Sequence, residues 1–240
     1  MKIIAEIPAR YDSKRVKQKN LRHIGGKPLI SYAIEAAKNS TELTDIYVNT
    51  ESDLIGRIAK KYGVNFYKRK QELAEDTVSS DEFNYDFMKN VNSDIVVMIN
   101  PVAPLIKSKD IDKMVKYYLD NDFDTLIPIR EEKLHAFCRN KAVNFSEEKP
   151  VTTFCDSRPV NFDVNNRLPM TQELIPIQIC VWTVCIWSAN IFIKSFQESG
   201  YGVFSGKVGL YKFPKDRSLK VSTIEDFNLA DNIIKGMKIS

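Results

Sequence analysis

The stretch IPARYDSKRVKQKNL, residues 7–21, follows the first apolar run of the chain and carries an unusual density of positive charge. Together with residue 22 it contains one acid, Asp12, and these six cations: Arg10, Lys14, Arg15, Lys17, Lys19 and Arg22. A loop that leaves a strand at the carboxyl edge of a sheet presents backbone N–H groups and cations to a phosphate. A solvated surface loop explains the charge as well, so the charge alone leaves both interpretations open.

Strand-like and helix-like runs alternate on either side of this loop. The pattern predicts strands at 2–7, 45–50, 65–69, 94–100 and 124–130, and helices at 27–40, 51–63, 79–91 and 108–121. This alternation is typical of an α/β fold with a mainly parallel, twisted sheet, right-handed crossovers and helices on both faces. Such sheets bind ligands at the carboxyl ends of their strands.

The alternation is interrupted at residues 131–173, which are rich in Asn, Pro and short β-prone pieces. We expect an insertion there, not a second core. The α/β pattern returns in the runs 177–187, 188–199, 207–214 and 222–236, and Ser222 or Thr223 is expected to cap the last helix. The sequence therefore predicts one domain over residues 1–240 with one insertion.

Composition excludes several classes of protein. A formal charge of +4 does not describe a nucleic-acid or membrane polycation, and we expect neither partner. The four cysteines form no CxxC pair and the two histidines lie far apart, which argues against structural zinc. No run approaches the ~20 apolar residues that span a bilayer. The expectation is a cytoplasmic protein with reduced thiols.

Two motifs resemble those of a known family. Residues 7–37 resemble the N-terminal signature IPAR-x-x-SK-x-x-x-x-KN of the cytidylyltransferases that activate sialic acid and related eight- or nine-carbon sugar acids. The matching positions are Ile7, Pro8, Ala9, Arg10, Ser13, Lys14, Lys19 and Asn20. A second element of that family is similar at Arg69, Glu72, Leu73, Asp76, Thr77 and Ser80. Neither GxxxxGK[ST] nor GxGxxG is present, so P-loop and dinucleotide fingerprints are excluded.

The resemblance implies a Rossmann-like fold in which the first loop holds the CTP phosphates and the second element closes over cytosine and ribose. Arg10 and Lys19 are the expected catalytic cations, whereas Arg15 and Lys17 stand at variable positions and are expected to tolerate alanine. The expected nucleotide-binding residues are Ala9, Arg10, Ser13, Lys19, Asn20, Arg69, Asp76, Thr77 and Ser80. Two alternatives stay open: Arg69 as a surface residue, and Asp76, Thr77 or Ser80 as a cap of the following helix.

The acceptor side departs from the family pattern. Where the family carries Gln-Pro-Thr-Ser-Pro-Leu-Arg, this chain has NPVAPLI at residues 100–106, which leaves Asn100 as a candidate to bind the acceptor. Gln172 is a second candidate. The run Val181, Trp182 and Thr183 stands where an Arg and an Asn-Gly would be expected, so the usual recognition of the acceptor carboxylate is not evident.

The expected metal ligands are replaced. The family carries Asp-x-Asp-Thr before its last helix, and this chain has Lys220 and Ser222 at the two acidic positions. An ammonium and a hydroxyl do not bind a hard divalent cation together. Lys220 is therefore a third candidate catalytic residue, and a decayed metal site is the equal alternative. Magnesium is expected to arrive with CTP.

The function that the resemblance implies is transfer of CMP from CTP to a sugar acid with release of pyrophosphate. A nucleotidyltransferase of the same fold with another acceptor, or a silent nucleotide-binding paralogue, remains an alternative. The family uses the region of residues 131–173 to dimerise, and a homodimer would cover its aromatic residues. These are Phe137, Phe145, Phe154 and Phe162.

Overall fold

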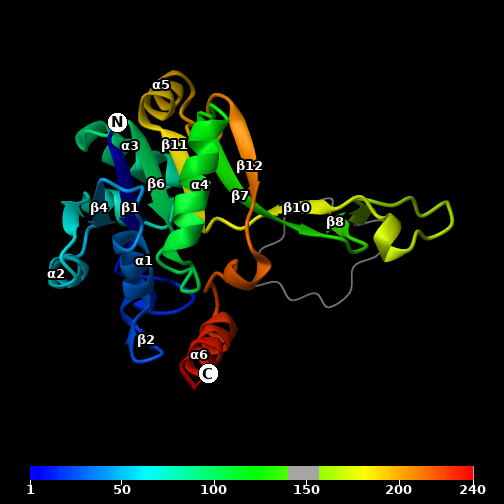
Figure 1. Ribbon diagram of the computed structural model, residues 1–240, viewed down its shortest axis with the longest axis horizontal. Helices are drawn as coiled ribbons and strands as arrows, with labels where there is room; N and C mark the ends of the chain where they lie inside the picture. Colours follow the sequence, from blue (N-terminus) through cyan, green and yellow to red (C-terminus); the bar gives the residue numbers. More distant parts are fainter. Residues whose placement is uncertain (140–156, 240) are drawn as a thin grey trace. The chain divides into compact units, whose positions relative to one another are not determined.

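The computed structural model describes residues 1–139 and 157–239, which form two compact units. The first unit comprises Met1–Ile129 and Cys180–Ser240, and the second comprises Arg130–Ile179. Figure 1 shows the elements coloured along the sequence. Phe145 and Phe154, expected to need cover, lie outside the described residues.

The first unit alternates strands and helices as the sequence predicts. Its first half contains β1 (Ile3–Pro8), α1 (Leu29–Lys38), β4 (Asp45–Thr50), α2 (Asp53–Lys61), β5 (Asn65–Lys68), α3 (Ser80–Asn90), β6 (Ile95–Ile99), α4 (Ser108–Asp120) and β7 (Thr125–Glu132). Its second part contains β11 (Val184–Ser188), α5 (Ala189–Ser199), β12 (Val208–Lys212) and α6 (Ile224–Ile239). Short elements are η1 (Lys19–Leu21), β2 (His23–Ile24), β3 (Lys27–Pro28), η2 (Gln71–Ala74) and η5 (Lys215–Arg217).

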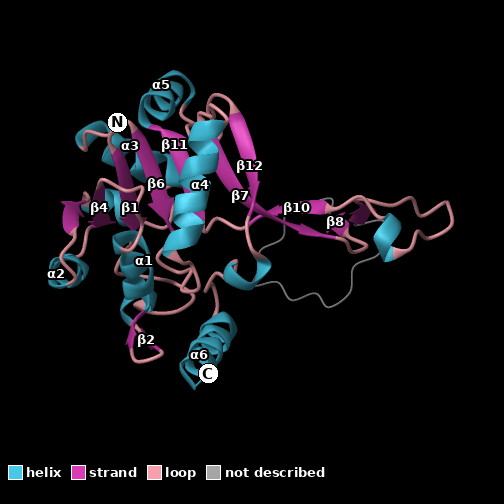
Figure 2. Ribbon diagram, viewed as in Figure 1, coloured by secondary structure: helices cyan, strands magenta, loops and turns pink. Residues whose placement is uncertain are grey.

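The main sheet is mixed and mostly parallel. Its strand order is β10-β7-β11-β6-β1-β4-β5, where β10 spans Ile177–Cys180, and β12 is also paired to β7. Strand β1 runs parallel to β4 and β6, with Ile7 opposite Val48 and Ile4 opposite Val96. Strand β11 is antiparallel to β6 and β7. The carboxyl ends of β1, β4, β5 and β6 therefore meet at one edge of the sheet, where the basic loop begins (Figure 2).

Helices cover both faces of this sheet, as expected from the sequence. Ile3, Ala5 and Ile7 of β1 pack in one core cluster with apolar residues of α1, α2 and α4. Ile4 points the other way, into a second cluster with residues of α3 and α5. This alternation follows from the two-residue period of a strand, and both faces are apolar because both are covered.

Glu6 interrupts the apolar pattern of β1. Its side chain is fully buried, and its Oε1 accepts a hydrogen bond of 2.6 Å from Asn49 Nδ2. Its Oε2 has no partner among the described residues. Burial raises the pKa of the Glu6 carboxyl to about 8, so the residue is mostly neutral at pH 7.

The last helix is fastened to the N-terminal hairpin of β2 and β3. Thr223 caps α6, because its Oγ1 accepts the Asp226 N–H at 3.2 Å. Asp231 of α6 accepts the N–H of Gly25 at 2.7 Å in the hairpin turn, where Gly25 has a φ of 55°. Figure 1 shows α6 in red near β2. Residues far apart in the chain thus shape the surroundings of the basic loop.

The second unit is small and built around a two-stranded antiparallel sheet. Strands β8 (Phe137–Arg139) and β9 (Ser157–Pro159) pair, and η4 (Thr171–Glu173) and β10 (Ile177–Cys180) follow. Asn161 Nδ2 donates to the carbonyls of Leu134 and Ile175, each at 3.0 Å. No helix among the described residues is long and apolar enough to cross a membrane.

Candidate functional site

A cavity of about 860 Å³ lies between the basic loop after β1 and the segment that begins with η2. It opens at the carboxyl edge of the sheet, since Ala9 follows β1 directly and donates its N–H to the Asn49 carbonyl of β4 at 2.9 Å. The lining residues are Arg10, Asp12, Ser13, Lys14, Lys17, Gln18, Gln71, Ala74, Glu75, Asp76 and Thr77. The structure thereby brings together four of the predicted nucleotide-binding residues: Arg10, Ser13, Asp76 and Thr77.

Asp76 joins the two walls of this cavity. Its Oδ1 lies 2.7 Å from Arg10 Nη1, and its Oδ2 lies 2.9 Å from Lys14 Nζ. Hydrogen bonding from Lys14, together with Arg10, lowers the pKa of the Asp76 carboxyl. The carboxylate stands where two cations converge, and paired cations of this kind also bind phosphate oxygens.

Asn20 and Ala9 support the basic loop from its buried side. Asn20 is buried, and its Nδ2 donates to the Arg10 carbonyl at 3.0 Å, which fixes the backbone that carries the Arg10 side chain. Its Oδ1 has no partner among the described residues. Ala9 is fully buried. Neither side chain lines the cavity, so both residues support the loop from inside.

Arg69 also lies inside the protein, not on the surface. It is 4% exposed, and its Nη2 lies 3.2 Å from Glu51 Oε2. The other oxygen of Glu51 accepts the Tyr11 N–H at 2.6 Å, so this buried pair connects the end of β5 to the basic loop. The alternative interpretation of Arg69 as a surface residue is wrong.

The cap of α3 is Ser79. Its Oγ accepts the Glu82 N–H at 3.3 Å, and Glu82 Oε2 accepts the Ser79 N–H at 2.7 Å, a complete capping box. The alternative that Asp76, Thr77 or Ser80 caps this helix is therefore wrong. Ser80 is the exposed first residue of α3 and does not line the cavity.

Lys19 and Lys220 are not among the residues that line the cavity. Lys19 Nζ donates to the Val221 carbonyl at 2.8 Å, so the basic loop contacts the segment before α6. Burial, and then the charges of Arg15, Lys220 and Arg10, lower the pKa of Lys19 to about 8. The positive charge of Arg15 contributes to the lowered pKa of both lysines, an interaction that the sequence pattern did not indicate.

Asn100 follows β6 and is already hydrogen-bonded within the protein. Its Nδ2 donates to the Trp182 carbonyl at 2.9 Å, and its Oδ1 accepts the Val102 N–H at 3.2 Å. Trp182 has a φ of 50°, an uncommon conformation for a bulky side chain. Gln172 belongs to the second unit, where it is exposed in η4 and its carbonyl accepts a hydrogen bond from Lys133.

The residues at the expected metal position do not suit a divalent cation. Lys220 brings a positive charge, and the nearby Asp226 already accepts the N–H groups of Ser222 and Thr223 at 2.8 and 2.9 Å. Across residues 1–139 and 157–239, no three His, Cys, Asp or Glu side chains are grouped so that they could hold a metal ion. The donor set is that of an anion site, not of a magnesium site.

The fold and this cavity together indicate a class of protein. A doubly covered, mostly parallel sheet with cations and a tight loop at its carboxyl edge is the architecture of nucleotide-binding α/β proteins.

Comparison with known proteins gives the family. A family model described as Cytidylyltransferase matches residues 4–175. The N-acylneuraminate cytidylyltransferase of Streptococcus agalactiae serotype V is 30% identical over 234 residues, covering 95% of this chain and 52% of that protein. Post-translational flagellin modification protein B of Campylobacter coli is 29% identical over 240 residues, covering 97% and 95%. The chain belongs to the cytidylyltransferase family.

A solved structure agrees on the fold. CMP:2-keto-3-deoxy-manno-octonic acid synthetase, complexed with CTP, matches with a TM-score of 0.68 at 15% identity, covering 99% of this chain and 100% of that one. The present chain spans about half the length of the N-acylneuraminate cytidylyltransferases that it matches.

Proposed function

We propose that this protein transfers CMP from CTP to a sugar acid of the sialic or ulosonic type and releases diphosphate. The observation that carries the proposal is the cavity at the carboxyl end of β1, in a region that matches the cytidylyltransferase family, where Arg10 and Lys14 converge on one anionic group. The relatives named above support the acceptor class.

The chemistry requires charge stabilisation more than an enzyme nucleophile. The acceptor hydroxyl forms a new bond to the α-phosphorus of CTP, the bond to the β-phosphate oxygen breaks, and the hydroxyl proton is released. Negative charge grows on the transferred phosphate and on the departing diphosphate. Arg10 and Lys14 lie on a loop that Asn20 holds from inside, so their charges are preorganised for this task.

The ligand-free arrangement implies one rearrangement. Asp76 occupies the anion position between Arg10 and Lys14, and a triphosphate bound there would repel its carboxylate. We infer that the segment of residues 71–77 moves or reorients when the nucleotide enters, which would bring Thr77 toward the ligand.

Three further features belong to the proposal. Magnesium would reach the site complexed to the CTP phosphates, since the described residues offer no suitable ligand set. The protein would act in the cytoplasm, and as a homodimer formed through residues 131–173. Asn100 and Gln172 remain the proposed acceptor contacts, and Asn100 would have to release the Trp182 carbonyl to make one.

The test is a diphosphate-release assay with each of the four nucleoside triphosphates against a panel of sialic, legionaminic, pseudaminic and eight-carbon ulosonic acids. Mass spectrometry would identify the product. We expect a CMP adduct with CTP and at least one of these acids. Release with another acceptor only would correct the acceptor class, and no release with any acceptor would support a silent paralogue.

A further inference from the structure

Three cations without an ion-pair partner among the described residues act on one another next to the proposed nucleotide cavity, which Lys14 and Lys17 line on either side of Arg15 in the sequence. Arg15 and Lys19 come from the loop after β1, and Lys220 comes from the segment before α6. The bond from Lys19 Nζ to the Val221 carbonyl brings these two segments into contact. In the described part of the chain, none of the three lies within ion-pair distance of an acid, whereas Arg10 and Lys14 share Asp76.

The electrostatics of this cluster are unfavourable in the free protein. Burial and the charge of Arg15 lower the pKa of Lys220, and they are also the two largest causes of the lowered pKa of Lys19. Asp226 is the acid that counteracts both shifts, and its carboxylate is already bound to two backbone N–H groups. Like charges that are close together and partly buried repel one another and destabilise the fold, unless a bound anion neutralises them.

We infer that Arg15, Lys19 and Lys220 form an anion subsite that binds a diphosphate group without a metal ion held by the protein. The inference deepens the proposed function and rests on it for the role of the ligand, which is the leaving group of the transfer. Arg15, expected from the sequence to tolerate substitution, becomes a binding residue.

The charge balance favours diphosphate over the carboxylate of a sugar acid. Three cations face one acid, so a ligand with several negative charges is needed to neutralise the cluster, and a sugar acid supplies one. Guanidinium and ammonium groups from two segments also suit the spread of oxygens on a diphosphate. A divalent cation in the same place would meet three like charges.

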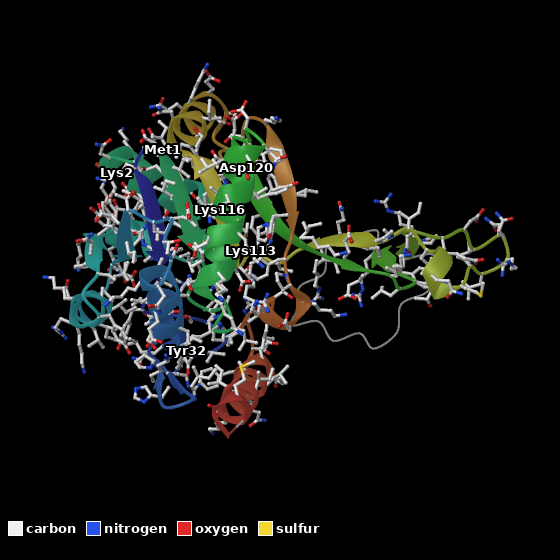
Figure 3. The ribbon with its side chains drawn as sticks, in the orientation of Figure 1. Met1, Lys2, Tyr32, Lys113, Lys116 and Asp120 are labelled. Atoms are coloured by element: carbon white, nitrogen blue, oxygen red, sulfur yellow. The ribbon has the colours of Figure 1, made fainter. Side chains whose placement is uncertain are left out.

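The experiment measures the binding of inorganic diphosphate by titration calorimetry in buffer containing EDTA. The variants are Lys220→Met and Arg15→Met, with Lys220→Arg as the conservative replacement. The matched control is Lys113→Met, which removes one exposed charge from α4, where Figure 3 labels it. Melting curves accompany every variant.

We expect the wild type and Lys113→Met to bind diphosphate alike without metal. Lys220→Met and Arg15→Met should bind about 10- to 100-fold more weakly, the usual effect of losing a charged hydrogen bond. Lys220→Arg should retain most of the affinity. Lys220→Met should melt no lower than the wild type, because it removes a repelled charge that makes no hydrogen bond within the described residues.

Several results would overturn the inference. These are no diphosphate binding by the wild type, binding only when magnesium is added, or unchanged affinity in both variants. Weakened binding of a sugar acid with unchanged diphosphate binding would reassign the cluster to the acceptor. The proposed function is tested separately, by the CMP-transfer assay. If no acceptor receives CMP but the wild type still binds diphosphate without metal and Lys220→Met does not, the proposed function is wrong and the diphosphate subsite stands.

Discussion

At the scale of single residues, Asp76 is the group whose ion pairs would have to change if the proposed CTP complex forms. Its carboxylate holds Arg10 and Lys14 across an open cavity, so the cations are positioned before the nucleotide arrives. Under the proposed function, the same contact competes with the CTP phosphate. Substitutions on the two sides of this ion pair should therefore have opposite effects on nucleotide affinity.

Replacing Arg10 by alanine should lower kcat/KM about 100-fold, because a preorganised contact to developing phosphate charge is worth on the order of 3 kcal/mol. Steady-state kinetics at saturating acceptor would measure the loss. Arg10 lies on a loop and its guanidinium is partly exposed, so the melting temperature should change little. Full activity in a folded Arg10→Ala variant would remove Arg10 from the site.

Replacing Asp76 by asparagine should tighten CTP binding two- to fivefold, roughly the value of an exposed ion pair that no longer has to be broken. Fluorescence or calorimetric titration would show the change, and added salt should narrow the difference between variant and wild type. Weaker CTP binding in Asp76→Asn would mean that the Asp76 carboxylate contacts the nucleotide directly.

Sequence patterns predicted the chemical roles of these residues better than they predicted where the residues lie in the structure. The motif placed Arg10, Ser13, Asp76 and Thr77 in one site, and the structure groups them. It did not indicate that Asn20 and Arg69 are buried supports, since their partners, the Arg10 carbonyl and Glu51, depend on tertiary packing. Nor could the spacing of residues along the chain predict that the charge of Arg15 acts on Lys220.

At the scale of elements, β1 carries both the loop and a buried acid. Glu6 has a pKa of about 8 in the folded state, against 4.5 when unperturbed. Between these values the folded protein holds a proton that the unfolded chain releases, so this residue makes stability fall as the pH rises from 4.5 to 8.

Glu6→Gln should remove that dependence. The amide can still accept the Asn49 hydrogen bond, so at pH 7 the variant should be more stable by about 3 kcal/mol, with little difference at pH 4.5. Denaturant unfolding of both proteins across this pH range would measure the gap. A gap that stays constant with pH would show that Glu6 does not titrate as its burial implies.

Element prediction succeeded where one periodicity runs through a whole segment. The helices α2, α3 and α4 appear where apolar residues recur at helical spacing between polar caps. The run 177–187 was harder, because its apolar residues continue through a break: β10 ends at Cys180 and β11 begins at Val184. The left-handed conformation of Trp182 and its bond from Asn100 create that break, and neither is visible in the local sequence.

At the scale of the whole molecule, the second unit exposes much apolar surface. Its exposed large apolar residues are Leu134, Phe137, Val160, Val164, Leu168, Met170 and Ile175. So many in a unit of this size are typical of a surface that another chain covers.

We expect the protein to be a dimer at micromolar concentration, by light scattering. Removing residues 131–173 should give a monomer that still binds CTP, because the cavity at β1 contains no residue of the second unit. A monomeric mass for the intact protein would contradict this prediction, and loss of CTP binding in a folded deletion variant would show that the units share the nucleotide site.

The contacts from Lys19 to Val221 and from Gly25 to Asp231 impose an order of events during synthesis. The basic loop and the hairpin after it are synthesised long before their partners, Val221 and Asp231. Until residues 221–231 emerge, the cations of the loop lack the contact to Val221, and we expect them to meet the anionic surfaces of the ribosome and its RNA. Maturation of the site thus waits for residues 221–231, and a polypeptide stopped before α6 would keep its nucleotide motifs without the contacts that fasten the basic loop and the hairpin after it.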